Sequence, residues 1–359
     1  MGVKTPESLC IEPVNFTQIS GWNADDLRPA FVAFKNSCQA LKKQERGKRM
    51  GLSMSFGIWH DICERAQKVT TQDEKAVRQF FEENFTPYRA YDQDKNQIGL
   101  YTGYYESSLK GSLYPSEKYA YPLYKRPPDL TKQGNQYGKK GAFSFGPHHD
   151  RRSIDEGALK EKDLELIWVD CPVDAFFLHI QGSGRVQLED GRFIKVGYDG
   201  ANGHPYTPIG RILIDQGHVE KEKMSMQAIR DWIKKYPDKG RDLMNQNASY
   251  VFFKILDKIG AIGAQGVPVL TGRSLAVDRR YIPYGVPVWL DASHPDNAIN
   301  LQRLLIAQDT GGAIKGPLRG DVFWGFGDMA AQIAGQMKSK GKSYLLLPKK
   351  IPFEGCYKG

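Results

Sequence analysis

The segment LIAQDTGGAIKGPLRGDVFWGFG, residues 305–327, constrains the possible folds more than any other part of the chain. Two runs of apolar and aromatic residues, each typical of a β-strand, are separated by a glycine-rich turn. The glycines permit tight turns and close approach of neighbouring backbones. The pattern therefore predicts compact β-structure with Asp309 and Asp321 near strand ends, a position where rigid strand edges often carry active-site residues.

Hydrophobic periodicity divides the rest of the chain into helical and β-rich parts. Residues 24–87 carry apolar side chains at helical spacing, and 207–235 repeat that pattern with an interruption at Gly217. Strand-like alternation runs from 98 to 124. Further strands are predicted at 164–170, 175–181 and 192–197, and in several short runs after Val267. The sequence therefore predicts a mainly β protein with helices, of the α+β class.

Length and composition fit two folded domains. The chain has 359 residues, of which 40% are hydrophobic and 11% aromatic. That content supplies a core and excludes a mainly disordered chain. No run of 18 apolar residues occurs, so no membrane-spanning helix is predicted. The net charge of +9 suits an acidic polymer. No nucleic-acid-binding motif accompanies the charge, and we expect no nucleic-acid partner.

Acid–base chemistry in the C-terminal β-rich region must rest on aspartate, because no glutamate occurs from Lys223 to Phe353. Asp278 joins Asp309 and Asp321 in the same sequence texture. Aspartate has a reference pKa of about 3.9, so a general acid at neutral pH needs burial or a second carboxylate to raise its pKa. The three aspartates fit that requirement, although aspartates of this kind also commonly cap β-turns. No histidine accompanies them, and no metal site is predicted there.

Two further segments combine aromatic and polar groups that suit a carbohydrate. Residues 101–106 read YTGYYE, and residues 179–185 read HIQGSGR. Tyrosine rings stack on sugar rings, while hydroxyl and amide groups bind sugar hydroxyls and acetamido groups. Each segment also has a purely structural interpretation. The tyrosines of the first could form the core of a strand, and the second could be a hairpin turn. The second lacks the GxGxxG spacing of a dinucleotide site.

The five cysteines lack the CxxC spacing that indicates zinc. Cys38 and Cys63 each fall on the apolar stripe of a predicted helix. They are either two buried thiols or a disulfide between packed helices, and the disulfide requires an oxidising compartment. The run His148-His149-Asp150 resembles a metal cluster but falls in a polar loop, so we expect it at the surface.

The order of these segments resembles the membrane-bound lytic transglycosylase A family, bacterial proteins that cleave murein. The resemblance runs from about Phe31 to Pro348 and is carried by YTGYYE, FFLHIQGSGRVQL, VGYDGANGHPYTPIGRILI, SYVFF, AVDRRYIPYGVPVWL and AQDTGGAIKGPLRGDVFWGFG. It implies a double-psi β-barrel domain of residues 1–105 plus 246–359, with N-terminal helices. It also implies an inserted β-rich domain of residues 106–245, with a glycan groove between the two. Ser107 stands where the family commonly has proline.

The resemblance implies cleavage of the β-1,4 bond between N-acetylmuramic acid and N-acetylglucosamine in peptidoglycan without water, giving 1,6-anhydromuramoyl products. Asp321 then matches the single catalytic acid and base, Asp309 and Asp278 match supporting aspartates, and no metal or organic cofactor is needed. The substrate-binding segments match Thr102, Gly103, Tyr104, Tyr105, Gln181, Gly182, Ser183, Gly184 and Arg185. The alternatives are a hydrolase with two carboxylates, a non-catalytic murein-binding protein, or a lytic enzyme whose acid is Glu106.

The family's setting also implies a compartment and partners. We expect peptidoglycan glycan strands and other cell-wall enzymes as partners, at the periplasmic face of the bacterial outer membrane. The family's lipoprotein signal is missing, and Cys10 has no apolar segment before it. We therefore interpret the chain as a trimmed, soluble form of a lipid-anchored protein. Because the periplasm is oxidising, we predict a Cys38–Cys63 disulfide and a buried free thiol at Cys171.

Overall fold

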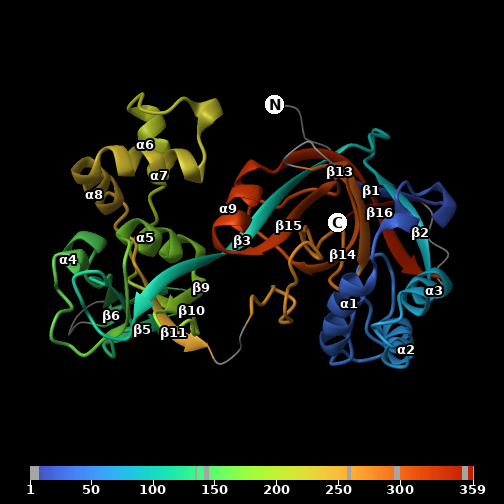
Figure 1. The fold of residues 1–359 in the computed structure, drawn as a ribbon, viewed down its shortest axis with the longest axis horizontal. Coiled ribbons are helices and arrows are strands. Elements are labelled where there is room, and N and C mark those ends of the chain that lie inside the picture. Colours follow the sequence, from blue (N-terminus) through green and yellow to red (C-terminus); the bar gives the residue numbers. More distant parts are fainter. Residues whose placement is uncertain are drawn as a thin grey trace. The chain divides into compact units, whose positions relative to one another are not determined.

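The computed structural model describes residues 8–133, 136–140, 145–256, 260–294, 300–349 and 355–358. The chain separates into two compact units. Unit 1 is Met1–Tyr105 with Gly260–Gly359, and unit 2 is Glu106–Ile259. Strand β3 (Gly99–Ser112) begins in unit 1 and ends in unit 2 (Figure 1). The mixed helix and strand content confirms the predicted α+β class.

The centre of unit 1 is a closed ring of β-strands. Each strand in the ring is hydrogen-bonded to the next, in the order β3, β15 (Arg319–Phe326), β12 (Ser274–Val277), β14 (Asn300–Asp309), β13 (Pro287–Ser293) and β16 (Lys338–Pro348). The ring closes because β16 also pairs with the start of β3. Closure leaves the ring without an unpaired edge, which agrees with the expected β-barrel. β12 and β14 run parallel, and this pair brings the ends of the two segments that carry Asp278 and Asp309 together.

Further strands and four helices complete unit 1. The sheet continues from β16 through β2 (Phe85–Tyr91), β1 (Ser8–Pro13) and β17 (Gly355–Lys358). The helices are α1 (Arg28–Leu41), α2 (Phe56–Gln67), α3 (Glu74–Asn84) and α9 (Gly327–Gln336), with 3₁₀ turns at Phe16–Gln18 and Trp22–Ala24. The helices α1, α2 and α3 confirm the helical prediction for 24–87 up to Asn84, and they gather on one side of the strands (Figure 1). Their apolar stripes are buried in the same core as the barrel.

Two disulfide bonds lie in unit 1. Cys38 of α1 and Cys63 of α2 are bonded, with their Cα atoms 5.5 Å apart, which confirms the predicted pair. A second bond joins Cys10 and Cys356, which face each other across β1 and β17. The sequence does not predict this pair, because 346 positions separate the two cysteines. Cys171 is free, as predicted, but it is partly exposed rather than buried.

Unit 2 is built on a second set of paired strands. Its strands are the end of β3, β4 (Tyr121–Tyr124), β8 (Glu165–Val169), β9 (Ser183–Leu188), β10 (Phe193–Ala201) and β11 (Val251–Leu256). A separate small sheet consists of β5 (Leu130–Gln133), β6 (Gln136–Lys140) and β7 (Phe145–Gly146). β10 pairs antiparallel with β9 on one side and with β11 on the other. Because β11 pairs with β10, the compact unit extends to Ile259, past the expected boundary at 245.

The helices of unit 2 correct one prediction. They are α4 (Arg151–Asp155), α5 (Pro172–Gln181), α6 (Ile209–Asp215), α7 (Met226–Lys235) and α8 (Pro237–Asn245), with a 3₁₀ turn at Lys221–Lys223. The predicted strand at 175–181 is wrong, because these residues belong to α5. Pro172 starts that helix and Gly182, with φ of 77°, ends it. A short apolar run does not distinguish a buried strand from a buried helix, and α5 packs its phenylalanines against α6, α7 and α8.

The prediction that the run 148–150 lies at the surface is wrong for His148, whereas His149 is exposed. His148 is buried rather than at the surface, and Asp150 caps α4 by accepting from the backbone amide of Ser153. Among the residues that the structure describes, no cluster of three or more His, Cys, Asp or Glu side chains is suited to hold a metal ion. Over the same residues, none of the helices combines the length and apolar character needed to cross a bilayer.

Candidate active site

Three barrel strands bring Asp309 and Asp321 into one row. Ala276 of β12 pairs with Asp321 of β15 on one side and with Asp309 of β14 on the other. Paired residues on neighbouring strands project to the same face of a sheet, and two strand spacings amount to about 9–10 Å. Ala276 therefore occupies the strand position between the two aspartates.

Asp321 is partly buried in unit 1. Its Oδ1 accepts a hydrogen bond from the Thr102 hydroxyl at 2.5 Å. Burial raises the pKa of Asp321, and the charge of Asp309 acts in the same direction. The Thr102 hydrogen bond and the Arg319 charge oppose this rise, but the pKa stays above its ordinary value. A raised pKa increases the protonated fraction of a carboxyl group, as a general acid requires.

Asp309 accepts hydrogen bonds on both carboxylate oxygens. Its Oδ1 accepts from the backbone amides of Ala264 and Thr310, each at 2.8 Å. Its Oδ2 accepts from the Tyr104 hydroxyl at 2.9 Å. Burial and the charge of Asp309 raise the pKa of Tyr104 well above its ordinary value, so this phenol remains a donor. Asp309 thus joins the end of β14 to the chain at Ala264 and to β3.

Asp278 follows β12 and binds a different set of groups. Its carboxylate accepts from the Arg280 guanidinium, with an Nη2–Oδ2 distance of 2.6 Å, and from the backbone amide of Gly316 at 3.0 Å. Burial alone would raise the pKa of Asp278, but these hydrogen bonds outweigh burial and lower it. Gly316 lies in the glycine-rich turn before β15. Asp278 therefore holds that turn as a charged acceptor.

The tyrosine segment lies on β3, as its alternation predicts. Thr102 and Tyr104 contact the two aspartates as described above, while Tyr105 packs against the core of unit 1. The packing around Gly103 leaves no room for a side chain. A Cβ atom there would lie 2.7 Å from Cδ1 of Trp324 and 2.8 Å from the Cα of Ala334.

The predicted residues Gln181, Gly182, Ser183, Gly184 and Arg185 all lie in unit 2, from the end of α5 into β9. The Ser107 hydroxyl donates to the Gln181 side-chain oxygen, and Ser107 also pairs with Gly184 between the parallel strands β3 and β9. The packing here accommodates the serine that replaces the family's common proline.

Glu106, which the sequence left open as an alternative acid, is buried in unit 2 and engaged by two cations. Arg185 donates to its Oε2 from Nε at 2.7 Å, and the Lys195 ammonium lies 3.3 Å from its Oε1. Both carboxylate oxygens therefore face positive charge. Glu106 is thus part of a buried ion cluster with Arg185 and Lys195.

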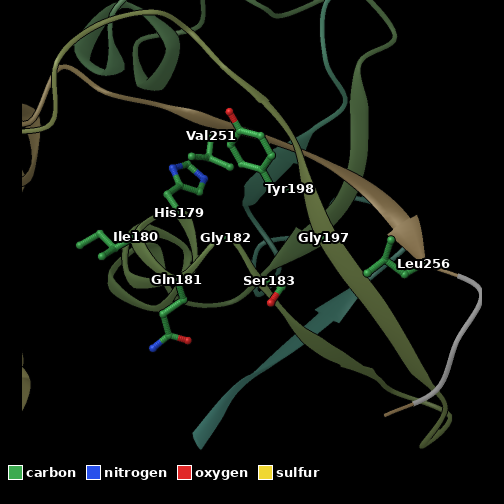
Figure 2. Close-up of a pocket in the computed structure, with 9 residues that line it drawn as sticks. All are labelled: His179, Ile180, Gln181, Gly182, Ser183, Gly197, Tyr198, Val251 and Leu256. Carbon is green, nitrogen blue, oxygen red and sulfur yellow. The ribbon is translucent and has the colours of Figure 1, made fainter. Parts of the chain in front are cut away.

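A pocket of about 530 Å³ lies beside the 181–183 loop in unit 2. Its lining residues are His179, Ile180, Gln181, Gly182, Ser183, Gly197, Tyr198, Val251 and Leu256 (Figure 2). In Figure 2 the rings of His179 and Tyr198 lie near Val251, while the Gln181 side chain extends in another direction.

His179 is held neutral beside this pocket. Its Nδ1 lies 3.1 Å from the Arg151 guanidinium. Burial, with the Arg151 charge, lowers the pKa of His179 well below its ordinary value. Arginine only donates, so Nδ1 accepts and the ring hydrogen is on Nε2.

Two residues near these sites, Arg319 and Tyr198, are not predicted from the sequence. Arg319 precedes Asp321 by two positions on an exposed-looking turn, and Tyr198 follows an ordinary strand pattern. The signal that would have found Arg319 is its closeness in sequence to the candidate acid.

Comparisons with known proteins match most of the chain. Residues 100–254 match the profile of the MltA specific insert domain, and residues 273–347 match that of the 3D domain. The membrane-bound lytic murein transglycosylase A of Escherichia coli K12 is 36% identical over 253 residues, or 68% of this chain and 65% of the relative. That of Vibrio cholerae is 34% identical over 260 residues, or 70% and 66%. The match thus spans just under two thirds of these curated relatives.

Solved structures resemble the whole chain. MltA from Neisseria gonorrhoeae, in its monoclinic form, has a TM-score of 0.82 and 32% identity, covering 96% of this chain and 94% of that one. A lytic transglycosylase of Burkholderia pseudomallei has a TM-score of 0.69 and 37% identity, covering 97% and 99%.

Proposed function

The chain belongs to the membrane-bound lytic murein transglycosylase A family, and from this premise we propose that it cleaves peptidoglycan without adding water. The bond is the β-1,4 linkage between N-acetylmuramic acid and N-acetylglucosamine, and the products carry 1,6-anhydromuramoyl ends. A structure of E. coli MltA, 28% identical with a TM-score of 0.66, holds chitohexaose, which supports a glycan strand as the substrate here.

The observation that carries the proposal is the partly buried Asp321, whose pKa burial raises. Protonated Asp321 donates its proton to the glycosidic oxygen as the bond from C1 to that oxygen breaks. The Asp321 carboxylate then takes the proton of the muramoyl C6 hydroxyl, whose oxygen bonds to C1. The proton count balances, and Asp321 carries no covalent intermediate. An intramolecular nucleophile needs no second carboxylate to activate water.

The environment of the other carboxylates supports a single acid and base. A hydrolase would need a second carboxylate free to activate water or attack C1. Asp309 accepts on both oxygens from Tyr104 and two backbone amides, and Asp278 accepts from Arg280 and Gly316. We therefore assign Asp309 and Asp278 to supporting roles.

We assign glycan contacts to one segment of each unit, each taken by itself. In unit 1 these are Tyr104 and Tyr105 of β3, whose rings suit the face of a sugar. In unit 2 they belong to residues 181–185, at the end of α5 and the start of β9. The family relatives are named membrane-bound. We extend this to attachment at the periplasmic face of the outer membrane, with other cell-wall enzymes as partners. The net charge of +9 favours the acidic peptides of murein.

Mass analysis of products from purified sacculi tests the proposed function. Anhydro products are lighter than hydrolysis products by one water molecule, so one spectrum separates the two reactions. Asp321→Asn protein is the control for contaminating activity. Hydrolysis products from the native chain would establish the two-carboxylate alternative. Binding to sacculi with no soluble product would establish a non-catalytic binding protein.

A further inference from the structure

We propose that Arg319 is a positioning residue that fixes which oxygen of Asp321 carries the transferable proton. Arg319 donates to the Thr102 hydroxyl, so that this hydroxyl gives its single hydrogen to Oδ1 of Asp321 and leaves the proton to Oδ2. The inference rests on the proposed function only where it concerns the rate. Its claim about Asp321 stands on the geometry of unit 1.

The geometry is a chain of hydrogen bonds between β15 and β3. Nη2 of Arg319 lies 2.8 Å from Oγ1 of Thr102, and Oγ1 of Thr102 lies 2.5 Å from Oδ1 of Asp321. The guanidinium is anchored by further bonds from Nη1 to the carbonyl oxygens of Leu100 and Gly320. Arg319 therefore bridges two barrel strands and is fixed at more than one point.

The direction of donation follows from the chemistry of the groups. A guanidinium has five N–H donors and no acceptor, so the Thr102 oxygen accepts from Arg319. A hydroxyl has one hydrogen, and the positive charge behind Thr102 polarises that hydrogen toward the carboxyl. Without Arg319, the Thr102 hydroxyl and protonated Asp321 could each donate to the other. In the second arrangement the transferable proton would point at Thr102 rather than at a substrate oxygen.

The groups around Asp321 have opposite effects on its pKa. β3 contributes Thr102 and Tyr104, the end of β14 contributes Asp309, and β15 itself contributes Arg319. β12 contributes the uncharged Ala276. Burial and Asp309 raise the pKa of Asp321, whereas Arg319 lowers it. Removal of the guanidinium charge therefore moves the pKa of Asp321 upward.

Carboxyl carbon NMR titration tests this inference without any need for activity. The Asp321 signal is assigned by its loss in Asp321→Asn protein. We expect its midpoint to rise by about one pH unit in Arg319→Met, and to rise less in Arg319→Lys, which keeps the charge but not the fork of donors. Arg211→Met removes an exposed arginine of α6 and should leave the midpoint unchanged. An unmoved midpoint in folded Arg319→Met protein would overturn the inference.

The rate provides the second readout. We expect Arg319→Met and Thr102→Val each to lower kcat about 10–100-fold, the range for outer-shell groups that orient a reactive one, with KM changed much less. Thr102→Ser keeps the hydroxyl and should retain most of the rate. The Arg319→Met/Thr102→Val double variant should be no slower than the slower single variant, because both act through one hydrogen bond. Multiplying losses would refute the coupling.

These outcomes are distinct from failure of the proposed function. If the native chain releases no anhydro products, the function fails, while the NMR midpoints still decide the role of Arg319. If Arg319→Met does not fold, the Thr102→Val and Thr102→Ser pair tests the same hydrogen bond. Equal midpoints and equal rates in that pair would overturn the inference.

Discussion

Asp321, Asp309 and Asp278 are the same residue type, yet their surroundings give their carboxyl groups different chemistry. Asp309 and Asp278 each accept several hydrogen bonds from backbone amides and from a tyrosine or arginine side chain. Donors of this kind lower the pKa of Asp278 in spite of its burial. Asp321 accepts a hydrogen bond from a neutral hydroxyl and is partly buried, and burial raises its pKa. The number and charge of donors therefore distinguish the acid from its supports.

Asp321→Asn should lose turnover by at least about 10²–10⁴-fold, because an amide cannot cycle a proton. The same change should not weaken the fold. The raised pKa of Asp321 means that the folded state binds the proton more tightly than the unfolded state. Native stability therefore falls as the pH rises from the ordinary aspartate pKa through the raised one.

The asparagine variant avoids this loss of stability. Its Tm should exceed that of the native chain at neutral pH, and the difference should shrink at pH values below the ordinary aspartate pKa. Melting curves across a pH series, measured beside murein digestion, check both expectations. Activity within tenfold of the native chain, or a lower Tm at neutral pH, would contradict them.

At the scale of elements, β3 joins the chemistry of the site to the packing of the barrel. Gly103→Ala should destabilise unit 1 by about 1–3 kcal/mol, the usual cost of overpacking. The added methyl group would meet the Trp324 ring and the Ala334 backbone. Gly335→Ala on α9 is a matched control, since no atom lies within 4 Å of its new Cβ. Urea unfolding measures both, and equal stability of the two variants would show that β3 has room to move.

The other end of β3 carries the buried ion cluster of unit 2. Glu106→Gln should lower stability by about 3–5 kcal/mol, because it removes the buried carboxylate that Arg185 and Lys195 contact. The products formed per folded molecule should stay the same. Thermal melting and a digestion assay corrected for folded protein separate these effects. Native stability with lost turnover would instead identify Glu106 as the acid.

At the scale of the whole molecule, two disulfides stabilise unit 1 over different chain lengths. The Cys38–Cys63 bond spans 25 positions and the Cys10–Cys356 bond 346. The chain-entropy account gives about 3.5 kcal/mol for the first and about 6 kcal/mol for the second, before any native strain. Replacing both members of the longer bridge by serine should therefore lower the Tm more than replacing those of the shorter bridge.

Thiol titration provides the direct measurement for the disulfides. The unfolded, unreduced protein should titrate as one thiol, that of Cys171. Reduction should then lower the Tm while the rate at moderate temperature changes little, because the bridges join α1 to α2 and β1 to β17 rather than the strands that carry Asp309 and Asp321. Five titratable thiols in protein prepared under oxidising conditions would refute both bridges.

Local patterns in the sequence predicted the helices α1 to α3 and placed Cys38 and Cys63 on their apolar stripes. The family resemblance then implied the disulfide and the roles of the three aspartates. The local patterns depend on spacing within a few tens of residues. The tertiary structure alone decided that 175–181 form a helix and that Cys10 bonds to Cys356. It also decided that Asp321 has the raised pKa. Thr102, whose hydroxyl binds Asp321, is 219 positions away in the chain. Burial and hydrogen-bond partners arise only when distant segments pack together, and those contacts leave no periodic signal in the sequence.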